Sequence, residues 1–144
     1  MTAYVLMACS LALAADSERD AAIAKGLEQF RGTWTPESMQ MDGKFLSQER
    51  LKKVRLTIDG ENFTFDTGDD SHDGLYKIDP TKQPHELNIE VTRGDEKGKV
   101  YLVIYKFEDG KMIQCMHVDN ERRPTEFTGK AGSKNLYEVW RRVK

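Results

Sequence analysis

The sequence predicts a mainly β fold: an antiparallel up-and-down β-barrel of about eight strands with a short N-terminal helix. Short runs of alternating apolar and polar residues recur along the chain, and residues 87–91 are the clearest of them. Alternation of period two is typical of strands that bury one face. Turn dipeptides such as Asp59-Gly60 and Asp109-Gly110 join the runs. A series of hairpins without long helices between them favours an antiparallel barrel.

Two aromatic stretches at opposite ends of the strand series predict how the barrel closes. Gly32-Thr33-Trp34 opens the series, and Trp140-Arg141-Arg142 ends it. A tryptophan at the head of such a series can plug one end of a barrel, and a late arginine can lie across its ring in a cation–π contact. We therefore expect the first and last strands to pair, with Trp34 buried and Arg141 or Arg142 over its ring.

The predicted strands are separated by turns and short loops. They span residues 32–41, 54–58, 62–66, 74–78, 87–91, 100–107, 111–117 and 135–143. Pro36 interrupts the first of them, because a proline removes a ladder hydrogen bond and indicates an edge or a bend. Residues 100–107 are apolar on both faces, which is typical of a strand buried on both sides. We expect one face of that strand to look into the barrel and the other to lie under the N-terminal helix.

Two helical segments are predicted. Residues 16–30 have apolar side chains at helical spacing behind a polar cap, and this helix is expected to cover one end or side of the barrel. Residues 47–54 read as one or two helical turns capped by Ser47.

Length and charge restrict the classes of function. The 144 residues suffice for one domain, and 22 basic against 24 acidic side chains give a formal charge of −2. Such a balance provides no strong field for nucleic acid or for an anionic membrane. The aromatic residues of the predicted strands have no basic stripe among them, so core packing is favoured over base stacking.

The N-terminal stretch predicts export. Residues 1–15 carry no charge and contain Ala12-Leu13-Ala14, a small-residue cleavage pattern, shortly before the polar Asp16. The stretch is too short to cross a bilayer and is typical of a secretory signal peptide. We expect residues 1–15 to be removed, leaving residues 16–144 as one periplasmic or extracellular domain with no transmembrane span. The alternative is an intracellular protein with an apolar N-terminus.

Lipid anchoring is a further alternative. Residues 6–9 end in Cys9 and resemble a bacterial lipoprotein box, in which that cysteine would be lipidated. If cleavage instead follows Ala14, Cys115 is the only remaining cysteine, and the mature chain has no intramolecular disulfide.

The sequence assigns no catalytic residue, metal or cofactor, because it has no phosphate-binding glycine loop, no Ser-His-Asp order and no zinc-ligand spacing. One pair is of interest: Cys115 and His117 lie two apart on a strand and share a face. Such a pair could bind a metal or form a nucleophile. A small buried cysteine beside a surface histidine is the favoured interpretation. We predict a protein that is not an enzyme, with the Cys115/His117 face as the enzymatic alternative.

Two charged segments have structural interpretations. Residues 66–74 hold four aspartates that could gather Ca²⁺ weakly, but they lack the spacing and terminal glutamate of an EF-hand. A solvated acidic turn is therefore favoured. Arg123 and Glu126, in a polar loop before the last strand, are expected to tie that loop to the barrel.

The inward faces of the predicted strands decide whether the barrel can hold a ligand. Alternation places these residues inside: Phe63, Phe65, Tyr76, Ile78, Leu87, Ile89 and Val91, with either Leu102 and Ile104 or Tyr101, Val103 and Tyr105. This bulky set predicts a small apolar pocket at one mouth, because aromatic side chains fill most of a narrow barrel. The candidate ligand-binding residues are Phe63, Phe65, Tyr76, Tyr101 and Tyr105.

Several short motifs together resemble an uncharacterised planctomycete domain family. They are Gly32-Thr33-Trp34, Asp79-Pro80-Thr81-Lys82 with Pro84, Gly98-Lys99, Cys115, Arg123-Pro124-Thr125-Glu126-Phe127 and Arg142-Val143-Lys144. The resemblance covers residues 27–144. It implies a small, often exported protein with a lipocalin-like barrel, and it implies no catalytic residue.

Three functions follow as hypotheses. The first is an exported, non-enzymatic barrel that binds a small hydrophobic ligand or an envelope protein partner. The second is an enzyme of unknown type that uses the Cys115/His117 face or the barrel mouth. The third is a structural or protein-interaction module of the cell envelope without a ligand. The first and third are favoured over the second, although a fold does not fix a function.

Overall fold

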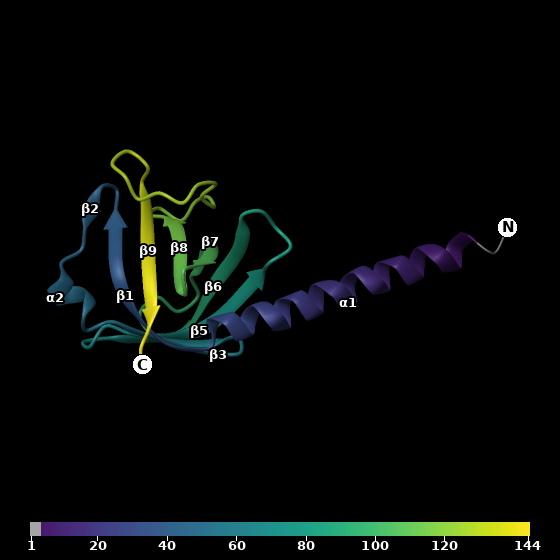
Figure 1. Cartoon of the computed structure of the whole chain (residues 1–144), viewed down its shortest axis with the longest axis horizontal. Helices are drawn as coiled ribbons and strands as arrows, with labels where there is room; N and C mark the ends of the chain where they lie inside the picture. Colours follow the sequence, from purple (N-terminus) through teal and green to yellow (C-terminus); the bar gives the residue numbers. More distant parts are fainter. Residues whose placement is uncertain (1–3) are drawn as a thin grey trace.

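The computed structural model describes residues 4–144, with side chains from residue 12 onward. One long helix projects from a β-barrel (Figure 1). In chain order the elements are α1 (Tyr4–Phe30), β1 (Gly32–Met41), β2 (Lys44–Phe45), α2 (Gln48–Leu51), β3 (Arg55–Asp59), β4 (Asn62–Asp66), β5 (Ser71–Asp79), β6 (His85–Arg93), β7 (Val100–Glu108), β8 (Lys111–His117) and β9 (Asn135–Arg142). The start of the predicted signal peptide, residues 1–3, and the side chain of Cys9 lie outside the described part.

Eight of the nine strands close into an antiparallel barrel. The strand order is β2-β1-β3-β4-β5-β6-β7-β8-β9, and β1 also pairs with β9. The short strand β2 is an addition that pairs with β1 alone. Apart from the closing pair β1–β9, neighbours in the barrel follow one another along the chain. Their connections are hairpins or short loops, except for the segment with β2 and α2 between β1 and β3 and the longer segment between β8 and β9. The predicted up-and-down barrel with an N-terminal helix is confirmed.

Local turn chemistry forms as the sequence predicts. Asp59 pairs with Asn62 across the β3–β4 hairpin, with Gly60 at positive φ between them. The helical turn α2 has Ser47 as its N-cap, and the Ser47 side chain accepts a hydrogen bond from the Arg50 amide. Leu51 from this turn is buried against the core.

Trp34 and Arg142 meet where the first and last strands pair. They are register partners in the β1–β9 ladder, and the Arg142 guanidinium lies 4.3 Å from the centroid of the indole ring. The indole N–H donates a 2.7 Å hydrogen bond to the Phe30 carbonyl, and Arg142 Nη2 donates to the Gln29 carbonyl at 2.7 Å. The contact therefore joins the end of α1 to both closing strands. Arg141, the other candidate, is exposed.

Pro36 bends β1 but does not end it. The strand runs through residue 36, where Pro36 pairs with Trp140, and the register with β9 shifts between Pro36 and Ser38. Pairing with β3 stops at Trp34, two residues earlier. The missing N–H of the proline thus falls at a β-bulge, which is a position that tolerates it.

The end of α1 plugs one end of the barrel. Phe30 is fully buried and makes edge-on contacts with Tyr105 and Phe107, each at 4.9 Å between ring centroids, and with Tyr76 at 5.6 Å. We call this aromatic cluster, completed by Trp34, the closed end. Close packing fills it with side chains, so any open volume must lie toward the opposite mouth.

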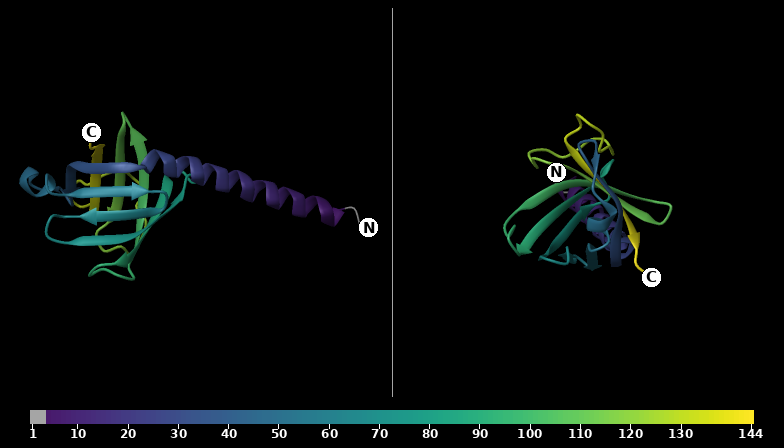
Figure 2. Two further views of the ribbon diagram at one scale, coloured as in Figure 1. Left: turned by 90° about the horizontal axis from the view of Figure 1, so that it is seen from below. Right: turned by 90° about the vertical axis from the view of Figure 1, so that its left-hand side faces the viewer.

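Helix α1 extends further than predicted and mostly leaves the barrel. It begins at Tyr4 rather than near Asp16, and residues 12–21 are exposed. Figure 2 shows it running away from one end of the barrel. At Gly26 the helix passes so close to β5 that an added Cβ would lie 2.7 Å from Ile78 Cδ1. Within residues 4–144, no helix combines the length and apolar character needed to span a bilayer.

The outer face of β7 is not covered by α1, contrary to prediction. Tyr101, Val103 and Tyr105 belong to the barrel core, which settles the inward face of this strand. The outer Ile104 is also buried, beside its register partner Cys115. The segment between β8 and β9 covers this area, because the Cys115 thiol donates to main-chain carbonyls of that segment. The helix cannot cover it, since α1 contacts the barrel only near its closed end.

Candidate functional site

A cavity of about 360 Å³ occupies the barrel interior between the closed end and the opposite mouth. Its walls are mainly inward-facing apolar side chains from the barrel strands. These are Leu56, Phe63, Phe65, Tyr76, Ile89, Val91, Tyr101, Met116, Leu136 and Trp140. The volume lies at the lower end of the range of known small-molecule pockets, about 300–1,000 Å³.

The aromatic side of this cavity is formed by β4, β5 and β9. Phe63 and Tyr76 pack with ring centroids 5.2 Å apart, and Phe65 meets Trp140 edge-on at 6.3 Å. The rings present flat apolar surfaces of the kind that hold a small aromatic or aliphatic molecule.

Four of the five predicted ligand-binding residues line this cavity. Phe63, Phe65, Tyr76 and Tyr101 contribute to its wall. Tyr105 does not, because it lies at the closed end against Phe30 and near His85. Tyr101 and Tyr105 both point inward from β7, but they lie four residues apart along the strand. Tyr101 is therefore at the mouth and Tyr105 at the closed end.

Glu138 places a carboxyl group deep in this apolar cavity. It is 5% exposed and lies between Leu136 and Trp140 on the inward face of β9. Burial raises the pKa of Glu138 to about 8, because the charged form is poorly solvated there. The nearby Trp140 indole lowers this pKa to a smaller extent, but its N–H makes no hydrogen bond of ordinary geometry.

Gln114 and Tyr76 form the other polar group at this depth. Gln114 is the register partner of Glu138 on β8, and its Nε2 donates a 2.9 Å hydrogen bond to the Tyr76 hydroxyl. Burial raises the pKa of Tyr76 well above its usual range, so this phenol stays protonated. The Gln114 amide nitrogen is thus engaged with the Tyr76 hydroxyl and, at 3.5 Å, with Met112 Sδ.

The mouth of the cavity carries a second acidic group and a histidine. The Tyr101 hydroxyl donates a 2.5 Å hydrogen bond to Glu96 Oε2, and this bond lowers the pKa of Glu96. Lys99 Nζ lies 3.3 Å from the other Glu96 oxygen. His72 stacks on Phe65 with ring centroids 6.4 Å apart, and its Nε2 lies 3.6 Å from an Asp70 oxygen.

Unsatisfied polar atoms gather at this cavity. Across the side chains that the structure describes, two buried nitrogen atoms lack a hydrogen-bond partner: His72 Nδ1 and Trp140 Nε1. Both residues line the cavity. A buried polar atom without a partner is costly unless something else satisfies it. The cavity thus contains donor and acceptor positions that the folded chain leaves open.

Sequence reasoning missed the polar members of the cavity: His72, Glu96, Gln114, Glu138 and Trp140. A signal was present for three of them. Alternation along β9 places Leu136, Glu138 and Trp140 on one face, and alternation along β8 places Gln114 between Met112 and Met116. Glu96 lies in a loop, where no periodicity predicts its direction.

The Cys115/His117 face lies outside the barrel. The Cys115 thiol is directed to the Glu126 and Thr128 carbonyls at 3.6 Å each, and burial raises its pKa. His117 is 4% exposed, and so is not the surface residue predicted. Its Nδ1 contacts Asp119 and its Nε2 lies 3.2 Å from Arg122 Nη2. Each side chain therefore has a structural partner of its own.

Among the described residues, no three His, Cys, Asp or Glu side chains lie close enough together to hold a metal ion. The acidic loop between β4 and β5 is held by internal hydrogen bonds, in which Asp66 accepts from the Gly68 amide at 2.7 Å. This arrangement is an Asx-type turn.

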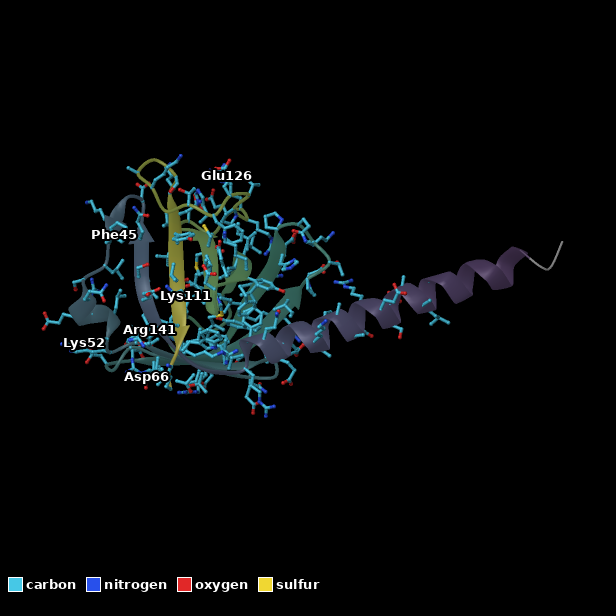
Figure 3. The ribbon with its side chains drawn as sticks, in the orientation of Figure 1. Phe45, Lys52, Asp66, Lys111, Glu126 and Arg141 are labelled. Carbon is cyan, nitrogen blue, oxygen red and sulfur yellow. The ribbon has the colours of Figure 1, made fainter. Side chains whose placement is uncertain are left out.

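Arg123 anchors the segment between β8 and β9 to the barrel. Arg123 donates to the Leu87 carbonyl at 3.0 Å, the Val103 carbonyl at 2.7 Å and Asn88 Oδ1 at 2.6 Å. Its ion pair is with Glu86, at 3.3 Å. The Glu126 side chain is exposed and stands on the loop beyond the strands (Figure 3). Arg123 was expected to tie this loop to the barrel, and its side chain reaches across to β6 and β7.

Comparison with known proteins assigns no activity to the cavity. No protein-family model matches the chain, and neither does any curated protein or solved structure.

Proposed function

We propose that the protein is a non-enzymatic binding protein that holds one small, mainly apolar molecule inside the barrel. The observation that carries this proposal is the cavity of about 360 Å³, lined by aromatic and aliphatic side chains in an otherwise filled barrel. A barrel of eight strands is just wide enough to be packed with side chains or to hold one small ligand. Here side chains fill the closed end, and the cavity leaves room for one small ligand.

The proposed site of action is outside the cytoplasm, as the uncharged residues 1–15 predict. Membership of the uncharacterised, lipocalin-like family that the motifs resemble would agree with both export and ligand binding. The enzymatic alternative at Cys115 and His117 receives no support from their contacts, since the thiol and the imidazole are each engaged with other groups.

A second candidate, a protein-interaction module of the cell envelope, is favoured by one observation. Phe45 on β2 is 70% exposed, and Met41 at the end of β1 is 43% exposed. Figure 3 shows Phe45 on the edge of the molecule, away from the barrel interior. Exposed aromatic side chains of this kind are enriched in protein interfaces.

Binding of a neutral apolar probe tests the proposed function. We expect N-phenyl-1-naphthylamine to bind the wild type saturably with one site, seen as enhanced probe fluorescence. Leu136→Trp should abolish this binding, because Leu136 is a half-buried wall residue at the mouth and indole would fill the space. Thr57→Trp is the matched control, since Thr57 is exposed on the outside of β3.

The proposal fails if the wild type shows no saturable binding of this probe. It also fails if Leu136→Trp binds the probe as well as the Thr57→Trp control, since binding would then lie elsewhere. Persistent binding to the control with loss in the Leu136→Trp variant would place the probe in the barrel.

A further inference from the structure

We propose that the ligand of the barrel cavity is a small monocationic amine with an aromatic or aliphatic body, and that its ammonium group pairs with the Glu138 carboxylate. This inference rests on the proposed function and adds the charge and chemical class of the ligand. It follows from the position of one carboxyl group, the charges around the cavity and the nature of its walls.

The Glu138 carboxyl has no structural role that explains its burial. Its side chain is 5% exposed, and among the described residues the one polar side chain that lowers its pKa is the Trp140 indole, which offsets the effect of burial only in part. Its register partner Gln114 is engaged with the Tyr76 hydroxyl, at 2.9 Å. Burying an ionisable group without a partner is strongly unfavourable, and apolar side chains fill the neighbouring inward positions of the strand. A cationic ligand would supply the missing partner.

The cavity wall carries acidic side chains, and the one that is charged at neutral pH in the empty barrel is Glu96 at the mouth. Among its wall residues are two carboxyl groups, Glu138 at depth and Glu96 at the mouth, but no lysine or arginine. The Glu96 carboxyl is held in its charged form by the hydrogen bond from Tyr101 and by Lys99, which lies outside the wall. An anionic ligand, such as a fatty acid, would enter against this field. A cation would be attracted by this negative potential.

The walls suit the remainder of such a molecule. Phe63, Tyr76 and Trp140 surround the space beside the Glu138 carboxyl. Faces of tryptophan, tyrosine and phenylalanine attract cations, most strongly where water is excluded. The same rings can pack against an aromatic body. The volume of about 360 Å³ is suitable for a compact amine and not for a large polycation.

Proton exchange distinguishes an amine from a neutral ligand. The raised pKa of Glu138, about 8, means that the carboxyl of the empty barrel is mainly protonated at neutral pH. Pairing with an ammonium group requires the ionised form, so amine binding should release a proton, and affinity should rise with pH up to about 8. The affinity of a neutral ligand that accepts a hydrogen bond from the protonated carboxyl should instead fall as pH rises over the same range, because the carboxyl loses that proton.

Most of the other polar groups that face Glu138 or the cavity do not change charge in that pH range. Tyr76 on β5 and Tyr101 on β7 have raised pKa values and stay protonated, and Gln114 on β8 does not titrate. Glu96 has a lowered pKa and stays charged. His72 on β5 is the one remaining titratable wall residue. His72→Gln therefore serves as a control for its contribution.

The test compares three probes that share an indole ring: tryptamine, a cation; tryptophol, a neutral alcohol; and indole-3-propionate, an anion. Calorimetry at pH 8 should find tryptamine about tenfold or more tighter than tryptophol, as expected for a charge-assisted pair. Indole-3-propionate should bind most weakly. Between pH 6 and pH 8, tryptamine affinity should rise by up to about tenfold per pH unit.

Glu138→Gln should weaken tryptamine about tenfold or more and leave tryptophol within a few-fold of the wild type. Glu90→Gln is the matched control, because it removes the same charge from the outer face of β6 and should change neither affinity. In the wild type alone, the calorimetric heat of tryptamine binding should depend on the ionisation enthalpy of the buffer, since a proton is released. This last measurement uses only the wild type, so it tests the inference even if the Glu138 variant does not fold.

The outcomes separate the two proposals. Equal affinities for tryptamine and tryptophol, with no proton release, would overturn the amine inference and leave the proposed function intact. Tighter binding of indole-3-propionate would overturn it as well. If neither these probes nor N-phenyl-1-naphthylamine bind, both proposals fail.

Discussion

At the scale of a single residue, the buried carboxyl of Glu138 sets a pH dependence of folding. Its pKa is raised to about 8 in the folded barrel, whereas the unfolded chain exposes it to water, where a glutamate has its ordinary, lower pKa. Between these two values the folded state holds a proton that the unfolded state has lost. The free energy of unfolding therefore falls as pH rises through this window and levels off above about pH 8.

We expect Glu138→Gln to remove this dependence. The amide has nearly the same shape and does not ionise, so the variant should be more stable than the wild type at pH 8, by a few kcal/mol at most, and close to it at pH 5. Urea denaturation at the two pH values measures the difference. A wild type whose stability does not fall between pH 5 and pH 8, relative to this variant, would show that the carboxyl is solvated or neutralised in the folded state.

At the scale of elements, the segment between β8 and β9 depends on Arg123. The guanidinium bonds to main-chain carbonyls of Leu87 and Val103, which belong to β6 and β7, and pairs with Glu86. Arg123→Ala leaves those carbonyls without this donor and loosens the cover over Ile104 and Cys115. We expect a loss of about 2–3 kcal/mol in the free energy of unfolding, as for a part-buried charged hydrogen-bonding group.

Glu126→Ala is the control for that experiment, since the Glu126 side chain is exposed and should contribute within about 0.5 kcal/mol. Thermal or urea unfolding of both variants makes the comparison. An Arg123 variant as stable as the Glu126 variant would contradict the anchoring role. Faster alkylation of Cys115 in Arg123→Ala than in the wild type would independently support the anchoring role, because the thiol is buried under this segment.

The strands were predictable from sequence because their signals are local. Alternation and turn dipeptides act over a few residues, and they placed Trp34, Phe63 and Tyr76 on the correct faces. What covers the outside of β7 and β8 was not predictable in the same way. The long connection containing Arg123 has no periodicity, and its contacts span about twenty to thirty-six residues along the chain.

The ligand site was predictable in part for the same reason. Aromatic wall residues on strands follow alternation, so Phe65 and Tyr101 were assigned to the wall. Glu138 was not, because a glutamate in a strand is normally taken to face water. Only the closure of β1 against β9 shows that its neighbours Leu136 and Trp140, and hence Glu138, point into the barrel.

At the scale of the whole molecule, the plugged end sets an upper limit on ligand length. Phe30, Tyr105 and Phe107 fill the barrel below Tyr76, and the cavity ends at Tyr76. In a series of primary alkanols, each added methylene should improve affinity about fourfold while it is still buried, from about 0.8 kcal/mol per group. Beyond the depth of the cavity the gain should stop, so long-chain alkanols should bind no better than medium ones.

Tyr76→Ala should move this limit to longer chains, because it removes the ring that separates the cavity from the space around Phe30. Tyr105→Ala is the matched control: it deletes the same kind of ring at the closed end, but Tyr105 does not line the cavity, so the limit should stay. Both variants should lose about 3–5 kcal/mol of stability, so their folding is checked by near-ultraviolet circular dichroism, with Tyr76→Leu as a milder substitute. Displacement of N-phenyl-1-naphthylamine gives the affinities. If the affinity of the wild type keeps rising up to long-chain alkanols, the aromatic side chains of the closed end must move aside for the ligand. The barrel could then hold molecules as long as a lipid chain.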